Sequence, residues 1–82
     1  MRVVGEVRKR YEILVFNKVV RDLVEREEHH RHYKDDWADI HHERVEAFDL
    51  PGARRRAEAR FPARDGFVIV DVVEAKEFDQ TE

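Results

Sequence analysis

Polar and apolar residues alternate near the start of the chain. The apolar side chains of Tyr11, Ile13 and Val15 recur at every second position, and Val7 extends the pattern backward. A period of two is typical of a strand that buries one face. We therefore predict a first strand at about residues 7–16.

The spacing of apolar residues changes after Asn17, a residue type that often caps the start of a helix. Four apolar side chains then recur at i, i+1, i+4 and i+5, namely Val19, Val20, Leu23 and Val24. This spacing predicts a helix over residues 18 to about 30. The alternative is a two-residue turn at Asn17-Lys18 between two strands, because valine also favours strands.

A polar segment rich in histidine and aspartate follows at residues 29–38. It predicts a loop, or a short strand at about 29–34 that turns at Lys34-Asp35-Asp36. A further strand is predicted over about residues 37–48, where Val45 and Ala47 share one side.

The next segment carries the clearest helix signals in the chain. Asp49 is a suitable N-cap, and Pro51 is tolerated in the first turn because an amide at that position would have no partner. Apolar residues then line one face at spacings of three and four: Leu50, Ala53, Ala57 and Phe61. Phe61-Pro62 ends the helix, since a residue before proline disfavours helical geometry. Arg64-Asp65-Gly66 predicts a turn.

The last strand is predicted at residues 67–73, where apolar residues occupy both faces. This pattern is typical of a central strand that is covered on both sides. Residues 77–82 are predicted to form a frayed acidic tail.

The predicted order, β-α-(β)-β-α-β, indicates one small α+β domain with a sheet of three or four strands and two helices. With a strand at 29–34, the order matches the split β-α-β arrangement of ferredoxin-like folds. The domain spans residues 1–82, with an ordered core at about 7–76. We expect both helices on one face of the sheet. We expect a second copy of the chain, or another protein, to cover the opposite face.

The composition restricts the class of protein. Charged residues make up 43% of the chain, the formal net charge is −3 and there is no cysteine. The lack of cysteine excludes disulfides and thiolate metal sites, and it favours the cytoplasm over secretion. The first residues lack the apolar core of a signal peptide, and no apolar run approaches the roughly 20 residues of a membrane span. We therefore expect a soluble cytoplasmic protein with no membrane partner.

All five histidines lie between His29 and His42. Imidazole and carboxylate groups bind transition metals, so a site for zinc, nickel, copper or iron is one hypothesis. Its candidate ligands are His29, His30, His32, Asp35 and Asp36. The same cluster is alternatively a pH sensor, because acidic neighbours favour the charged imidazole while neighbouring imidazoles oppose it.

Aromatic residues in the same segment indicate a contact surface. Tyrosine and tryptophan are enriched where proteins bind one another. The candidate surface consists of Tyr33, Trp37, His41 and His42. The alternative role for Trp37 is to close the edge of a small core.

Residues 53–64 contain five arginines and one glutamate, a local net charge of +4. A basic helical ridge is one feature of proteins that bind the phosphate backbone of RNA or DNA. The candidate residues are Arg54, Arg55, Arg56 and Arg60. The alternative is the charged outer face of a helix that packs through its alanines.

The sequence gives little support to an enzyme, because it contains no serine and no glycine-rich phosphate loop. The favoured hypothesis is a non-enzymatic protein–protein interaction module, an accessory subunit or inhibitor-like binder that forms a homodimer or binds another protein and needs no cofactor. Metal binding or pH sensing through residues 29–42, and nucleic-acid binding through the arginines, are the alternatives.

Overall fold

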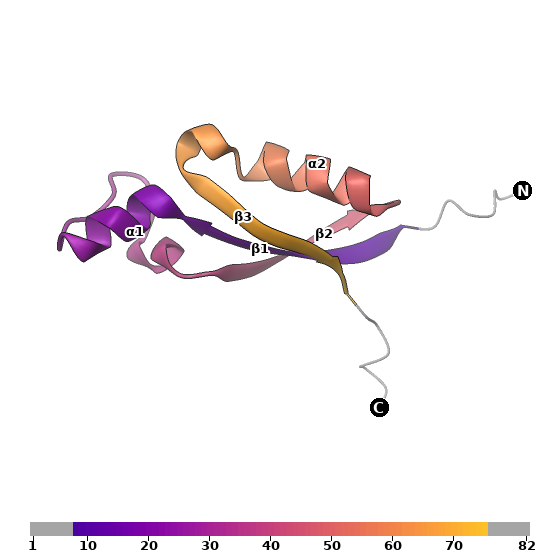
Figure 1. Ribbon diagram of the computed structural model, residues 1–82, viewed down its shortest axis with the longest axis horizontal. Helices are drawn as coiled ribbons and strands as arrows, with labels where there is room; N and C mark the ends of the chain where they lie inside the picture. Colours follow the sequence, from indigo (N-terminus) through magenta and orange to yellow (C-terminus); the bar gives the residue numbers. More distant parts are fainter. Residues whose placement is uncertain (1–7, 76–82) are drawn as a thin grey trace, which may run out of the picture.

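The computed structural model describes residues 8–75 of the chain. Its strands are β1 (Lys9–Asn17), β2 (His41–Ala47) and β3 (Phe67–Glu74), and its α-helices are α1 (Lys18–Glu25) and α2 (Leu50–Arg60). Two short 3-10 helices, η1 (Asp35–Ala38) and η2 (Ala63–Asp65), precede β2 and β3. The predicted α+β class is confirmed (Figure 1). The predicted acidic tail lies outside the described residues.

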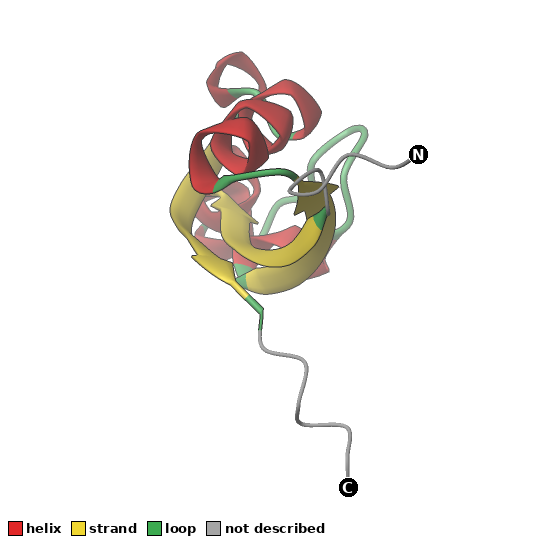
Figure 2. Cartoon of the chain, turned by 90° about the vertical axis from the view of Figure 1, so that its right-hand side faces the viewer, coloured by secondary structure: helices red, strands yellow, loops and turns green. Residues whose placement is uncertain are grey.

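The sheet has the order β2-β1-β3, and both outer strands run antiparallel to β1. The outer strands are therefore parallel to each other, and α2 connects them across one face of the sheet (Figure 1). Two parallel strands joined by a helix across an antiparallel strand form a split β-α-β unit. Figure 2, which views the molecule from its right-hand end, shows the strands curving beneath the helices.

The optional strand at residues 29–34 does not form, so the three-stranded alternative is the one observed. The chain bends there because the Nδ1 atom of His30 accepts hydrogen bonds from the backbone N–H groups of His32 and Tyr33, at 2.9 and 3.2 Å. These local bonds occupy amides that a strand would need for pairing. The following strand starts at His41 rather than at residue 37, because Trp37 lies in η1.

The prediction that the first helix extends to about residue 30 is wrong, since α1 ends at Glu25. Glu27 has a left-handed backbone, with φ of 63°, and its N–H donates to the carbonyl of Val24. The N–H of Glu28 donates to the carbonyl of Leu23 at 2.8 Å. These two bonds form a Schellman termination. The helix stops here because the apolar spacing ends at Val24.

The expectation of a central final strand is also wrong. β3 is an outer strand, and Val70 and Val73 are 49% and 39% exposed. A bulge interrupts its pairing, so Ile69 pairs with Val15 whereas Asp71 pairs with Leu14. The extra residue moves positions two apart to opposite faces of the sheet. The bulge therefore accounts for part of the apolar run, and coverage of the other face by a partner stays a prediction.

The two helices do not share a face, contrary to the prediction. α2 lies over the sheet, whereas α1 continues from the end of β1 and lies beyond the end of the sheet (Figure 1). The core fills the space between the sheet and α2 with fully buried Ile13, Ala53 and Ala57. The small alanines let the helix lie close to the strands. No helix in residues 8–75 is long and apolar enough to cross a membrane.

Both predicted N-caps are confirmed. The side chain of Asn17 accepts hydrogen bonds from the N–H groups of Val19 and Val20, and that of Asp49 accepts one from Gly52. Asn17 is fully buried and also donates from Nδ2 to the carbonyl of Asp65 at 3.1 Å. It therefore holds the end of β1, the start of α1 and the turn before β3 together.

We predict that Asn17→Ala lowers the free energy of unfolding by about 2–4 kcal/mol, because it removes a buried cap and leaves the partly buried carbonyl of Asp65 without its donor. Asp49→Ala is the matched control, since it removes an exposed cap and should cost only about 1 kcal/mol. Urea denaturation followed by circular dichroism measures both values. Equal losses in the two variants would contradict the central role of Asn17.

Candidate interaction surface

Trp37 packs against the end of the core on the α2 side of the sheet. Its ring stacks on that of His41, with centroids 3.9 Å apart and planes 5° apart. It meets Phe67 edge-on at 5.4 Å and lies 5.8 Å from Phe61. Tyr33 extends the cluster by an edge contact with Phe67 at 5.2 Å. η1 thus places Trp37 just past the end of α2, where it covers core that the helix does not reach.

Three of the four residues predicted as an interaction surface lie in this cluster, and one does not. Tyr33, Trp37 and His41 lie together and are partly buried against the core. His42 belongs to the opposite face of the sheet, because neighbouring residues of a strand point to opposite sides. The packing of Trp37 supports the alternative that it closes the edge of the core.

A polar network surrounds the cluster at the outer edge of β2. The Nε2 atom of His41 lies 3.0 Å from the carbonyl oxygen of Asp36, and its Nδ1 lies 3.7 Å from the carboxylate of Glu43. Arg60 of α2 donates to the same carboxylate at 3.0 Å and to the carbonyl of Arg44 at 3.0 Å. These bonds fasten α2 to β2 and occupy a carbonyl on an outer strand.

The histidines predicted as metal ligands are spread along the bend before η1. The ring of His29 lies 2.9 Å from the carboxylate of Asp35, while His30 turns its Nδ1 toward backbone amides. The hydrogen bond to Asp35, and then its negative charge, raise the pKa of His29 above the usual value. Within residues 8–75, no group of three or more histidine, aspartate or glutamate side chains is arranged to hold a metal ion. His32 and Asp36 do not complete such a group with these residues.

The candidate arginines occupy the outer side of α2. Arg54, Arg55 and Arg56 are exposed and form no ion pair within the described part of the chain. Arg60 differs, because Glu43 and the carbonyl of Arg44 bind its guanidinium. Three of the four predicted arginines are thus exposed and spread around the solvent side of α2, and the fourth joins α2 to the sheet.

The face of the sheet opposite α2 carries a second, larger group of side chains. The strand register places ten residues on this open face: Arg10, Glu12, Leu14 and Phe16 of β1; His42, Arg44 and Glu46 of β2; and Val68, Asp71 and Val73 of β3. Arg21 of α1 covers one end of it, with its guanidinium 3.7 Å from the centre of the Phe16 ring. The rest has no helix of the described chain over it (Figure 1).

Charges on the open face alternate between neighbouring strands. Arg10 pairs with Glu46, and Glu12 pairs with Arg44, as opposite residues of β1 and β2. The imidazole of His42 lies 3.6 Å from the carboxylate of Glu12. Leu14 is half-buried in the middle of these groups. One signal of this surface is visible in the sequence, because Leu14 and Phe16 are apolar residues on the otherwise polar side of the first strand.

Both outer edges of the sheet are partly closed to further strands. On β2, Arg60 occupies the carbonyl of Arg44. On β3, the side chain of Asp71 accepts a hydrogen bond from the N–H of Val72 at 2.9 Å, beside the bulge. Bulges and polar groups that occupy edge backbone atoms oppose the addition of another strand. The edges of the sheet are therefore less open to another chain than its uncovered face.

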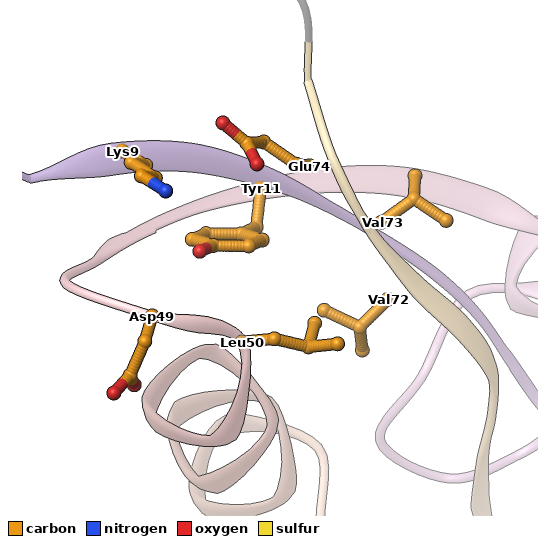
Figure 3. Close-up of a pocket in the computed structure, with 7 residues that line it drawn as sticks. All are labelled: Lys9, Tyr11, Asp49, Leu50, Val72, Val73 and Glu74. Atoms are coloured by element: carbon orange, nitrogen blue, oxygen red, sulfur yellow. The ribbon is translucent and has the colours of Figure 1, made fainter.

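A shallow hollow of about 450 Å³ lies on the α2 side of the sheet, beside β3. Tyr11, Leu50 and Val72 point toward one another there (Figure 3). Val73 points away from it (Figure 3). The floor of the hollow is apolar, and charged Lys9, Asp49 and Glu74 also line it. The hollow is small and open, and it brings together no group of catalytic side chains.

Comparison of the chain with protein-family models, with curated proteins and with solved structures found no match.

We predict that Trp37→Ala lowers the free energy of unfolding by about 2–3 kcal/mol, because the ring packs on three other rings of the core end. Trp37→Phe keeps part of this aromatic packing and should lose less than half as much. Chemical denaturation checks both variants. Unchanged stability in Trp37→Ala would instead show that the ring serves only a partner.

We predict that Asp35→Asn returns the pKa of His29 toward its usual value near 6.5, because the amide removes the charged hydrogen-bond acceptor. Since folding raises this pKa, the contact stabilises the fold at low pH, and the contribution is lost as the pH rises through the raised pKa. Proton NMR titration of the imidazole signals measures the shift. Asp36→Asn is the control, and an equal shift in that variant would contradict a specific pair.

Proposed function

We propose that this protein is a non-enzymatic interaction module that binds another protein chain through the open face of its sheet. The supporting observation is that no helix within residues 8–75 covers this face, which has half-buried Leu14 at its centre and Val73 39% exposed nearby. An apolar centre within a polar surround is the usual composition of a protein interface. Such a module serves as an accessory subunit or an inhibitor-like binder.

The balance of charge favours a protein partner on this surface. Arg10 and Arg44 are offset by Glu12 and Glu46 within the same two strands. A surface for a nucleic-acid backbone carries an excess of positive charge. The open face has no such excess, whereas the arginines exposed on α2 have no exposed aromatic side chain among them. The cysteine-free composition supports action in a reducing compartment such as the cytoplasm.

The proposal predicts that a photo-crosslinking amino acid at Val73 forms protein adducts in the cell of origin. The same amino acid at Arg55, on the outer side of α2, should form few adducts and serves as the matched control. Leu14→Lys in the same chain should abolish the adducts at position 73, because it places a charge at the centre of the contact. Gel electrophoresis and mass spectrometry detect the products.

Folding of each variant is checked by circular dichroism and thermal denaturation. Adducts at equal yield from positions 73 and 55, or none from position 73, would contradict the proposed function. Adducts that persist in the folded Leu14→Lys variant would show that another surface makes the contact.

A further inference from the structure

The central row of the open face has an order of side chains that is complementary to itself. Leu14 pairs with His42 on one side and with Asp71 on the other. Residues directly opposite each other in antiparallel strands share a face and lie close together. The row therefore reads base, apolar residue, acid across the sheet. If a second copy of the sheet is rotated by 180°, a half-turn, about an axis parallel to β1, the order is reversed. His42 of each copy then faces Asp71 of the other.

The next row is compatible with the same half-turn. Arg44, Glu12 and Val73 follow one another across the sheet. The half-turn places Arg44 over Val73 of the other copy, where the methylene groups of the arginine can cover the exposed valine. The half-turn also places Glu12 over Glu12 and Arg10 over Arg10 of the other copy. Within each sheet, the imidazole of His42 lies 3.6 Å from the Glu12 carboxylate, and Glu46 stands opposite Arg10.

This order of side chains indicates which partner the open face binds, and the inference rests on the proposed function. We propose that the open face binds a second copy of this chain, related by a two-fold axis that runs along β1 near Leu14. Sheets that pack face to face keep their strands within about 30° of each other, which preserves the contact between central rows. The polar closures at Arg60 and Asp71 disfavour a continuous sheet through the edges.

The width of the face sets the strength of this contact. Three strands spaced about 4.8 Å apart form a narrow surface. The area buried is therefore at the low end for a specific interface, below roughly 1,200 Å² in total, where complexes are weak or transient. We expect monomers and dimers to exchange at micromolar or higher concentrations of the chain.

The chain contains no cysteine, so single substitutions give clean probes of this geometry. Leu14→Cys lies beside the axis and should be joined readily to its copy by a short bismaleimide reagent, because sheets packed face to face lie about 10 Å apart, which is farther than a direct disulfide spans. Arg55→Cys, on the outer side of α2, is the matched control and should give several-fold less dimer. Denaturing gels and mass spectrometry measure the yields.

Off-axis positions test the direction of the axis. His42→Cys and Asp71→Cys should cross-link poorly alone and readily when the two variants are mixed, because each base faces the acid of the other copy. Arg44→Cys with Val73→Cys is a second mixed pair, which serves if the loss of the Asp71 acceptor disturbs β3. Preferred self-linkage of His42→Cys would overturn this arrangement.

These experiments can reject a second copy as the partner without rejecting the proposed function. Equal cross-linking at positions 14 and 55, together with a strictly monomeric wild-type chain in sedimentation at high concentration, would overturn the second copy as partner. In that case, Val73 adducts with a different protein would leave the proposed function intact. A concentration-dependent dimer that Leu14→Lys abolishes would support the two-fold contact.

Discussion

The arrangement of the elements depends on one buried amide, that of Asn17. It accepts hydrogen bonds from the first turn of α1 and donates to the carbonyl of Asp65 in the turn before β3. The backbone N–H of Lys18 adds a bond to the carbonyl of Gly66 at 2.8 Å. Gly66 has a left-handed φ of 97°, and a Cβ atom there would lie 2.7 Å from the Asn17 oxygen. The junction therefore requires glycine and asparagine together.

This junction decides which surfaces the helices cover. Because Asn17 ends β1 and starts α1 without an intervening loop, α1 continues past the end of the sheet instead of folding over a face (Figure 1). Of the helices in residues 8–75, α2 alone then lies over the strands. The connector after α1 returns through η1, and its Trp37 fills the space between the end of α2 and Phe67. The opposite face consequently stays open.

Local signals in the sequence were sufficient to predict much of this fold. Alternation in β1, the caps Asn17 and Asp49, and the alanine face of α2 each depend on neighbouring residues, and all are observed. The bulge in β3 was not predictable, because it depends on the register with a strand some fifty residues away. The path of the connector between α1 and β2 was not predictable for the same reason. It depends on the packing of Trp37 against Phe61 and Phe67, which are distant in the sequence.

The candidate site shows the same division between local and long-range information. The sequence indicated His42 as a contact residue but grouped it with Trp37, whereas the strand register separates them onto opposite faces. Leu14 carried a visible signal as an apolar residue among polar ones. Its neighbours His42 and Asp71 come from two other strands, and no periodicity within one segment brings them into a row.

Closed edges and an open face together limit how this chain associates. An outer strand with free backbone groups can recruit further strands without end, which leads to aggregation. Here Arg60 and Asp71 occupy edge groups with charged side chains. A face that pairs with its own copy through a two-fold axis is consumed when the second copy binds. The proposed association therefore stops at two chains, which suits a small domain whose core, in the part that the structure describes, is covered by α2 alone.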